Sequence, residues 1–94
     1  MMKEELQVLY NNRAQAYVSS GMWPEALADA DVAVELKKVQ NAKGHWRRGK
    51  ALVEMGRWEE AREGLREARE LGGDVKEVEG LLAEVEARLE RKKV

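Results

Sequence analysis

Several residue types are absent or rare in this chain of 94 residues, and each absence excludes a class of structure. Cysteine is missing, which excludes disulfides and thiolate metal sites and fits a reducing compartment. Phenylalanine is missing and proline occurs once, which disfavours architectures with many β-strands. The apolar runs are too short to span a bilayer, and no secretory leader is visible. We therefore expect one domain without direct membrane insertion.

An excess of charge of one sign is also missing, because 17 Lys and Arg stand against 18 Asp and Glu. Nucleic-acid binders usually carry a clear basic excess, so we expect no nucleic-acid partner. The chain does contain 44% hydrophobic and 37% charged residues. That mixture is typical of amphipathic helices, which bury one stripe of side chains and expose the other.

The parts of a catalytic or metal site are lacking as well. Ser19 and Ser20 are the candidate nucleophiles, and the single histidine, His45, lies in another predicted helix. Glutamates are spread at salt-bridge spacing instead of forming an acid pair, and no glycine loop of the phosphate-binding kind occurs. We therefore expect that the protein is not an enzyme and that it binds neither a metal nor a cofactor.

The sequence repeats itself with a period of 35 residues, the offset between Trp23 and Trp58. The segment 21–26 (GMWPEA) recurs as 56–61 (GRWEEA), and this period is typical of a helix-turn-helix solenoid unit. The same shift aligns four further pairs, which are Arg13 with Arg48, Ala14 with Gly49, Ala16 with Ala51, and Ala33 with Ala68. Because the two arginines repeat, we expect them to pair with Asp29, Asp31 or a neighbouring glutamate.

Four helices are predicted within the two repeats, at about 4–20, 24–37, 41–55 and 58–71, with a turn at 37–40 between the repeats. Glycines end three of these helices and Pro24 begins the second. Helical spacing predicts one stripe of side chains on the first helix, made of Leu6, Leu9, Ala14, Tyr17 and Val18.

A fifth helix is predicted after Asp74, which is a candidate N-cap with Glu77 in the capping-box position. Its apolar side chains form one stripe and its other face is charged, which predicts an end cap for a solenoid. The tail Arg91–Lys93 is expected to fray. The stripe consists of Val75, Val78, Leu82, Val85 and Leu89.

These features resemble the tetratricopeptide repeat family, with a small residue inside the first helix, a Gly-x-aromatic turn, and alanines in the second helix. His45 departs from the family pattern, which often has Trp there, and the closing proline is missing from both repeats. The resemblance covers about 5–90 and implies one all-α, TPR-like solenoid domain, with repeats at 5–38 and 41–73 and a capping helix at 74–92. It is carried by Ala14, Tyr17, Gly21, Trp23, Ala26, Ala33, Gly49, Leu52, Gly56, Trp58, Ala61, Leu65 and Ala68.

Two repeats and a cap are few, because fewer than three stacked units rarely bury enough surface to be stable alone. We therefore expect a fragment that lacks an upstream repeat. A partner protein over the first helix pair and self-association are the alternatives.

In this family the first helix of each repeat lines a concave groove. The resemblance places in it Val8, Asn11, Asn12, Gln15, Val18 and Ser19 from the first helix, and Lys43, Trp46, Arg47, Lys50 and Val53 from the third. Trp46 has no aromatic counterpart in the first repeat, so it belongs either to the groove wall or to the core.

The string at 9–17 (LYNNRAQAY), followed by Lys43-x-x-x-Arg47, resembles the carboxylate-clamp co-chaperones, which hold the carboxyl end of heat-shock chaperones. By this resemblance Asn12 is the clamp asparagine, and Lys43 and Arg47 are its basic pair. A further Lys and Asn come from the preceding repeat in that family. The expected peptide-binding residues are Asn11, Asn12, Gln15, Lys43, Trp46, Arg47 and Lys50.

More narrowly, the sequence is similar to the tetratricopeptide subunit of the fungal post-translational translocation complex of the endoplasmic reticulum. The similarity lies in the segments 10–17 and 43–50. The resemblance implies a protein-interaction module that binds the acidic C-terminal tail of a cytosolic heat-shock chaperone. It implies a cytoplasmic protein, held at the cytosolic face of the endoplasmic reticulum by a membrane-anchored translocon subunit. The alternative is a structural scaffold or oligomerisation module without clamp function.

Overall fold

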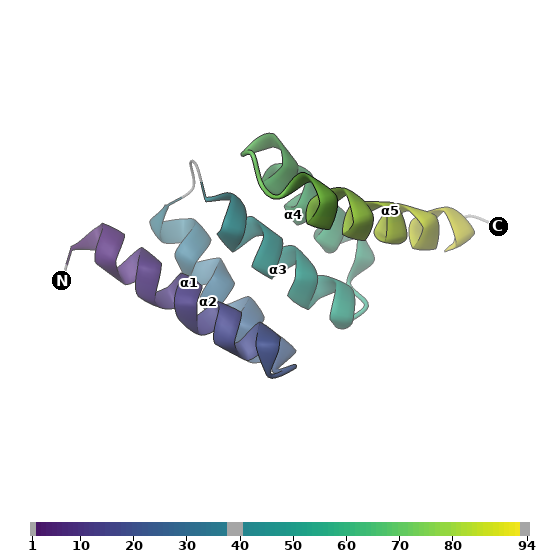
Figure 1. The fold of residues 1–94 in the computed structure, drawn as a ribbon. Coiled ribbons are helices and arrows are strands. Elements are labelled where there is room, and N and C mark those ends of the chain that lie inside the picture. The colour runs from purple at the N-terminus through teal and green to yellow at the C-terminus, as the bar shows by residue number, and fades with distance from the viewer. Residues whose placement is uncertain (1, 38–40, 93–94) are drawn as a thin grey trace.

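A computed structural model describes residues 2–37 and 41–92, which form five α-helices. Figure 1 shows three of them, α1, α3 and α5, on the near side, with α2 and α4 behind. The helices are α1 (Lys3–Ser19), α2 (Trp23–Leu36), α3 (Ala42–Glu54), α4 (Trp58–Glu70) and α5 (Val75–Lys92). The predicted all-α solenoid of two repeats and a capping helix is confirmed, with the ends of the first four helices within one residue of those predicted. Of the predicted turn only Lys37 is described, and Lys93 and the Val75 side chain lie outside the described residues.

The turns inside the two repeats have the same backbone structure. Gly21 and Gly56 have φ of 72° and 73°, which is the left-handed region that glycine adopts without a steric penalty. In the first turn the Met22 amide donates to the Tyr17 carbonyl over 2.9 Å, and in the second Arg57 donates to Leu52 over 2.9 Å. These bonds satisfy carbonyls at the helix ends, as in a Schellman motif.

The core lies where the helices of both repeats meet the capping helix. Alanines with no exposed surface, among them Ala26, Ala51 and Ala61, let the backbones approach closely. Trp58 packs half-buried against this cluster. The larger fully buried side chains fill the remaining space, and they are Leu52, Leu65, Leu82, Val78 and Val85.

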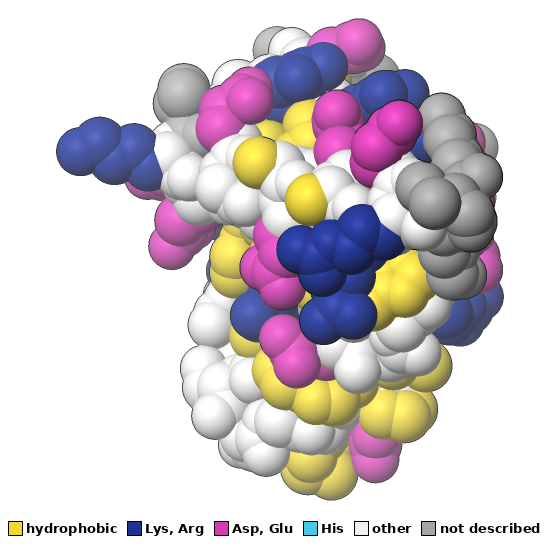
Figure 2. All heavy atoms as spheres, turned by 90° about the vertical axis from the view of Figure 1, so that its right-hand side faces the viewer, with side chains coloured by type: hydrophobic (Ala, Val, Ile, Leu, Met, Phe, Trp, Pro, Cys, Tyr) yellow, Lys and Arg dark blue, Asp and Glu magenta, His cyan; other side chains and the backbone are white. Residues whose placement is uncertain are grey.

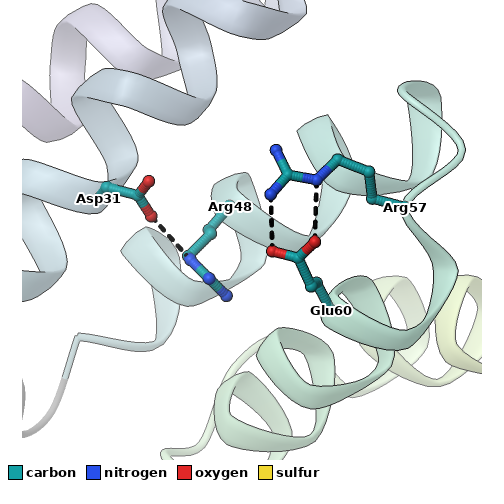
Figure 3. Close-up of polar contacts among 4 residues, drawn as sticks. All are labelled: Asp31, Arg48, Arg57 and Glu60. Carbon is teal, nitrogen blue, oxygen red and sulfur yellow. Dashed lines mark hydrogen bonds and ion pairs between the residues drawn. The ribbon is translucent and has the colours of Figure 1, made fainter.

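Both repeating arginines form the ion pairs that the sequence predicted, but with different geometry. Arg13 of α1 binds Asp29 of α2 within the first repeat, with its Nε 2.6 Å from Oδ2. Arg48 of α3 instead crosses to Asp31 of α2 in the preceding repeat over 2.7 Å (Figure 3). The position equivalent to Asp29 in the second repeat is Gly64, so Arg48 has no carboxylate there. One arginine therefore joins the helices of a repeat and the other joins the two repeats.

One member of the predicted stripe on the first helix is not buried. Leu9 is 51% exposed, although Ala14 in the same stripe is fully buried. Its equivalent in α3 is Gly44, which is buried beside the N-terminal end of that helix. Among the described residues α1 has no preceding helix pair against it, so its outer face stays open while the same face of α3 packs on α2.

The capping helix carries out the role that its pattern predicted. Val78, Val85 and Leu89 are buried against the preceding repeat, and the other faces of α5 are exposed. Figure 2 shows the side of the molecule at which the chain ends, where Lys and Arg lie among Asp and Glu side chains around smaller hydrophobic patches. Charged side chains of both signs therefore share this end of the solenoid with apolar and uncharged surface.

Two helical glycines should respond in opposite ways to alanine. In α5 a Cβ at Gly80 would meet nothing within 4 Å, whereas in α3 a Cβ at Gly49 would lie 2.8 Å from Leu65 Cγ. We expect Gly80→Ala to raise the free energy of unfolding by about 0.5–1 kcal/mol through helix propensity. Gly49→Ala should lower it by about 1–3 kcal/mol, because Leu65 is fully buried and cannot move aside. Urea unfolding of both variants measures this, and equal effects would contradict the close contact of α3 with α4.

Candidate functional site

A groove of about 810 Å³ opens between α1, α3 and the turn into α5. Six of the seven predicted peptide-binding residues line it, and Lys50 does not. The groove is lined by Gln7, Val8, Asn11, Asn12, Gln15, Lys37, Asn41, Ala42, Lys43, Trp46, Arg47, Leu71, Gly72, Gly73, Asp74 and Glu77. The structure thus brings together two segments separated by about thirty residues of sequence, as the predicted repeat stacking requires.

The floor of the groove is held by the side chain of Asn41, the N-cap of α3. Its Oδ1 accepts hydrogen bonds from the Gly44 amide and from Asn11 Nδ2, each over 3.0 Å. Its Nδ2 donates to the Ala33 carbonyl in α2 over 3.0 Å. Asn41 and Asn11 are 3% and 7% exposed, so this network is shielded from water. One asparagine therefore ties α1, α2 and α3 together beneath the groove.

Arg47 lies on the α3 wall and is held from α1. Its Nε donates to Gln15 Oε1 over 3.0 Å, and Gln15 in turn donates to Ser19 Oγ over 3.2 Å. Burial lowers the pKa of Arg47, yet a guanidinium stays protonated at neutral pH. Its two terminal nitrogens make no hydrogen bond to the described part of the chain, so the fork can still accept an anion.

The other predicted clamp residues are available in the groove. Asn12 on α1 and Lys43 on α3 are exposed and have no polar partner within the described residues. Trp46 does both things that the sequence left open, because it lines the groove and also packs half-buried against the core. Its indole Nε1 and the Oδ1 of Asn11 are buried and have no hydrogen-bond partner in the described structure.

Some residues of the predicted groove face lie elsewhere. Lys50 forms an ion pair of 3.0 Å with Glu54, and its ammonium lies 5.9 Å from the centre of the Trp23 ring. Val53 is buried in the core, and Val18 packs against it. Ser19, like these three, is not among the groove residues.

The groove also contains residues that the sequence analysis did not predict as part of it, notably Gln7, Lys37, Asn41, Asp74 and Glu77. The repeat offered a signal for some of them. Gln7, Ala42 and Glu77 are spaced by 35 residues and occupy equivalent positions on the first helix of successive units. Applying the register to the capping helix would have placed Glu77 on the wall.

Neither a metal site nor a membrane span is found in the described residues. No group of three or more His, Cys, Asp or Glu that could hold a metal ion occurs among residues 2–37 and 41–92. Within the same residues, no helix combines the length and the apolar character that a membrane crossing requires.

Comparison with known proteins places the chain among repeat proteins, although no family model matches it. It is 39% identical over 67 residues to the ER protein translocation subcomplex subunit sec67 of Schizosaccharomyces pombe, which covers 71% of this chain and 34% of sec67. The first TPR of Spaghetti (RPAP3), bound to the HSP90 peptide SRMEEVD, has a TM-score of 0.83 at 30% identity over 88% of this chain and 65% of that one. The first TPR domain of human RPAP3 has a TM-score of 0.82 at 30% identity over 93% and 68%.

The chain thus spans about a third of the length of sec67 and about two thirds of the solved domains. Helix order, the glycine turns and the stacked repeats agree with these similarities. The chain belongs to the tetratricopeptide repeat family and is a protein-interaction module.

Proposed function

We propose that the groove binds the acidic C-terminal tail of a heat-shock chaperone. The observation that carries the proposal is the meeting of Asn12, Lys43 and Arg47 in one groove, with the Arg47 fork and the Lys43 ammonium unpaired. Gln15 holds Arg47 from the neighbouring helix, which orders the cation before a ligand arrives.

The chemistry of these three side chains suits the end of a peptide that finishes in aspartate. Such an end presents two carboxylates on one residue, which no internal residue of a chain does. Arg47 can hold one carboxylate through two parallel hydrogen bonds, and Lys43 supplies a compact positive charge. The amide of Asn12 can donate to the remaining oxygen. Hydrogen bonds to charged groups contribute about 1.5–3 kcal/mol each, so each of these contacts should be measurable.

The similar proteins support the proposed peptide ligand and a site of action in the cell. The Spaghetti (RPAP3) repeat domain was solved with an HSP90 peptide that ends in Glu-Glu-Val-Asp, and it is 30% identical to this chain. The likeness to sec67 supports action at the cytosolic face of the endoplasmic reticulum, with a membrane-anchored translocon subunit as a second partner. In that setting the groove would receive chaperones that deliver precursors for post-translational translocation.

A scaffold function is the second candidate, and the open face of α1 favours it. Leu9 is 51% exposed although its equivalent Gly44 is buried, and Ala16 is exposed although its equivalent Ala51 is fully buried. A protein that packed on this face would bury them as α2 buries the face of α3. Binding of such a partner would be insensitive to the loss of charge at Lys43 and Arg47.

Calorimetric titration with the peptide Ser-Arg-Met-Glu-Glu-Val-Asp, beside the same peptide with an amidated end, tests the proposed function. We expect heat of binding from the free-acid peptide and at least a tenfold weaker response after amidation, because one of the two carboxylates is removed. Equal binding of both peptides would refute the proposed carboxylate clamp. If neither peptide bound, the scaffold function would be the remaining candidate.

A further inference from the structure

The groove carries opposite charges on its two sides. Lys37, Lys43 and Arg47 lie toward α2 and α3, whereas Asp74 and Glu77 lie at the start of α5. No ion pair joins Lys37, Lys43, Asp74 or Glu77 to any of the described residues. Elsewhere on the surface opposite charges do pair, as Arg57 and Glu60 do over 2.7 Å (Figure 3). The groove is therefore a place where both signs remain uncompensated.

Local structure accounts for the position of the two acids but does not neutralise them. Asp74 Oδ1 accepts a hydrogen bond from the Glu77 amide over 3.0 Å, which makes Asp74 the N-cap of α5. Acidic side chains are also favoured in the first turn of a helix by its dipole. Both side chains are nevertheless exposed, and both line the groove. They present negative charge to any ligand that reaches α5 from the clamp residues.

The span of the groove fits an extended peptide. Packed helices lie about 8–10 Å apart, so α1 and α5 on either side of α3 are separated by about 16–20 Å. Five extended residues cover about 16 Å. A terminal aspartate midway between α1 and α3 lies about 12–15 Å from α5. A residue four or five positions upstream can therefore reach the acids of α5.

Two polar atoms on groove-lining residues have no hydrogen-bond partner among the described residues. They are Asn11 Oδ1, an acceptor, and Trp46 Nε1, a donor, and both are buried. Buried polar atoms normally find partners, so both are unusual features of the groove wall.

We propose, on the basis of the clamp function above, that Asp74 and Glu77 select peptides with a basic residue upstream of the acidic end. The preferred ligand has its carboxylates at Lys43 and Arg47 and a Lys or Arg near Glu77. Tails that are acidic throughout bind less well, because their upstream carboxylates meet the acids of α5. This preference is opposite to that of a uniformly cationic groove, in which each added carboxylate strengthens binding.

Two peptides and two variants test this selection. The peptides are Ser-Arg-Met-Glu-Glu-Val-Asp and its Glu counterpart, Ser-Glu-Met-Glu-Glu-Val-Asp, and each is titrated into the unaltered chain. The double variant Asp74→Asn, Glu77→Gln removes both charges while asparagine keeps the N-cap. Glu84→Gln is the matched control, because Glu84 is exposed on α5 outside the groove.

For the unaltered chain we expect the Arg peptide to bind about three- to tenfold more tightly than the Glu peptide, since one favourable contact replaces one repulsion. The ratio should fall to about one in the double variant and stay unchanged in Glu84→Gln. If the ratio of the two affinities is unchanged in the double variant, the proposed selection by Asp74 and Glu77 is refuted. If amidation of the peptide still weakens binding in that case, the clamp function is retained. If neither peptide binds, both the selection and the proposed function are refuted.

Discussion

Replacing Arg47 by alanine is expected to weaken binding of a peptide that ends in free aspartate by about 10- to 100-fold. The guanidinium is positioned by Gln15 through a bond of 3.0 Å, and its unpaired fork can hold a carboxylate through two hydrogen bonds. Alanine removes both the charge and the fork. Titration calorimetry of the variant, with circular dichroism to verify helicity, measures the loss.

Arg48→Ala is the matched control for this prediction. Arg48 is the next residue on α3, but its guanidinium binds Asp31 and is not among the groove residues (Figure 3). We expect the affinity of the Arg48→Ala variant for the peptide to stay within about twofold of that of the unaltered chain. Its free energy of unfolding should fall by at most about 1 kcal/mol. Trp58→Leu should likewise lower stability more than affinity, because Trp58 packs against the core. If either change weakened binding more than Arg47→Ala, the clamp assignment would fail.

Asn41→Ala should lower the free energy of unfolding by about 2–4 kcal/mol. The variant loses the N-cap of α3 and leaves Asn11 Nδ2 without a partner in a buried place. The Ala33 carbonyl loses one of its two hydrogen bonds and keeps the one from the Lys37 amide. In a domain of this length the melting temperature should fall by roughly 10–20 °C. Thermal and urea unfolding followed by circular dichroism test this expectation.

Asn12→Ala is the control for Asn41→Ala. Asn12 is exposed and has no polar partner in the described residues, so its removal should change stability by less than about 0.5 kcal/mol. The same change should weaken peptide binding, because the amide is the proposed third contact of the clamp. Equal losses of stability in Asn12→Ala and Asn41→Ala would show that the buried network does not hold the three helices together.

Much of the fold could be predicted because local and repeated signals agree. Gly21 and Gly56 end helices for a backbone reason that the sequence displays directly, and the 35-residue register then aligns the tryptophans and the alanines. Arg13 and Arg48 were expected to find acidic partners, and they do. The different choice of partner depends on Gly64, which stands where the first repeat has Asp29.

The exposed position of Leu9 shows what helical spacing cannot reveal. Spacing says which side chains share a face, but a face is buried only if another element packs on it. Gly44 and Ala51 are buried on the equivalent face of α3 because α2 covers it, whereas the described chain places nothing over Leu9 on α1.

The candidate site divides in the same way. A resemblance in the sequence was enough to single out Asn12, Lys43 and Arg47, because the clamp motif is a local string in each repeat. The hydrogen bond from Arg47 to Gln15 and the buried network of Asn41 join side chains from different helices, so they depend on how the helices pack.

By itself, the sequence determined the five helices, their order and the repeat that stacks them, since glycine turns, alanine positions and apolar periodicity act over short distances along the chain. Only the tertiary structure decided that Asp74 and Glu77 share a groove with Lys43 and Arg47. Charge at a position is visible in any sequence, but its effect on a ligand depends on distance in space. That distance is set by the packing of α5 against the second repeat.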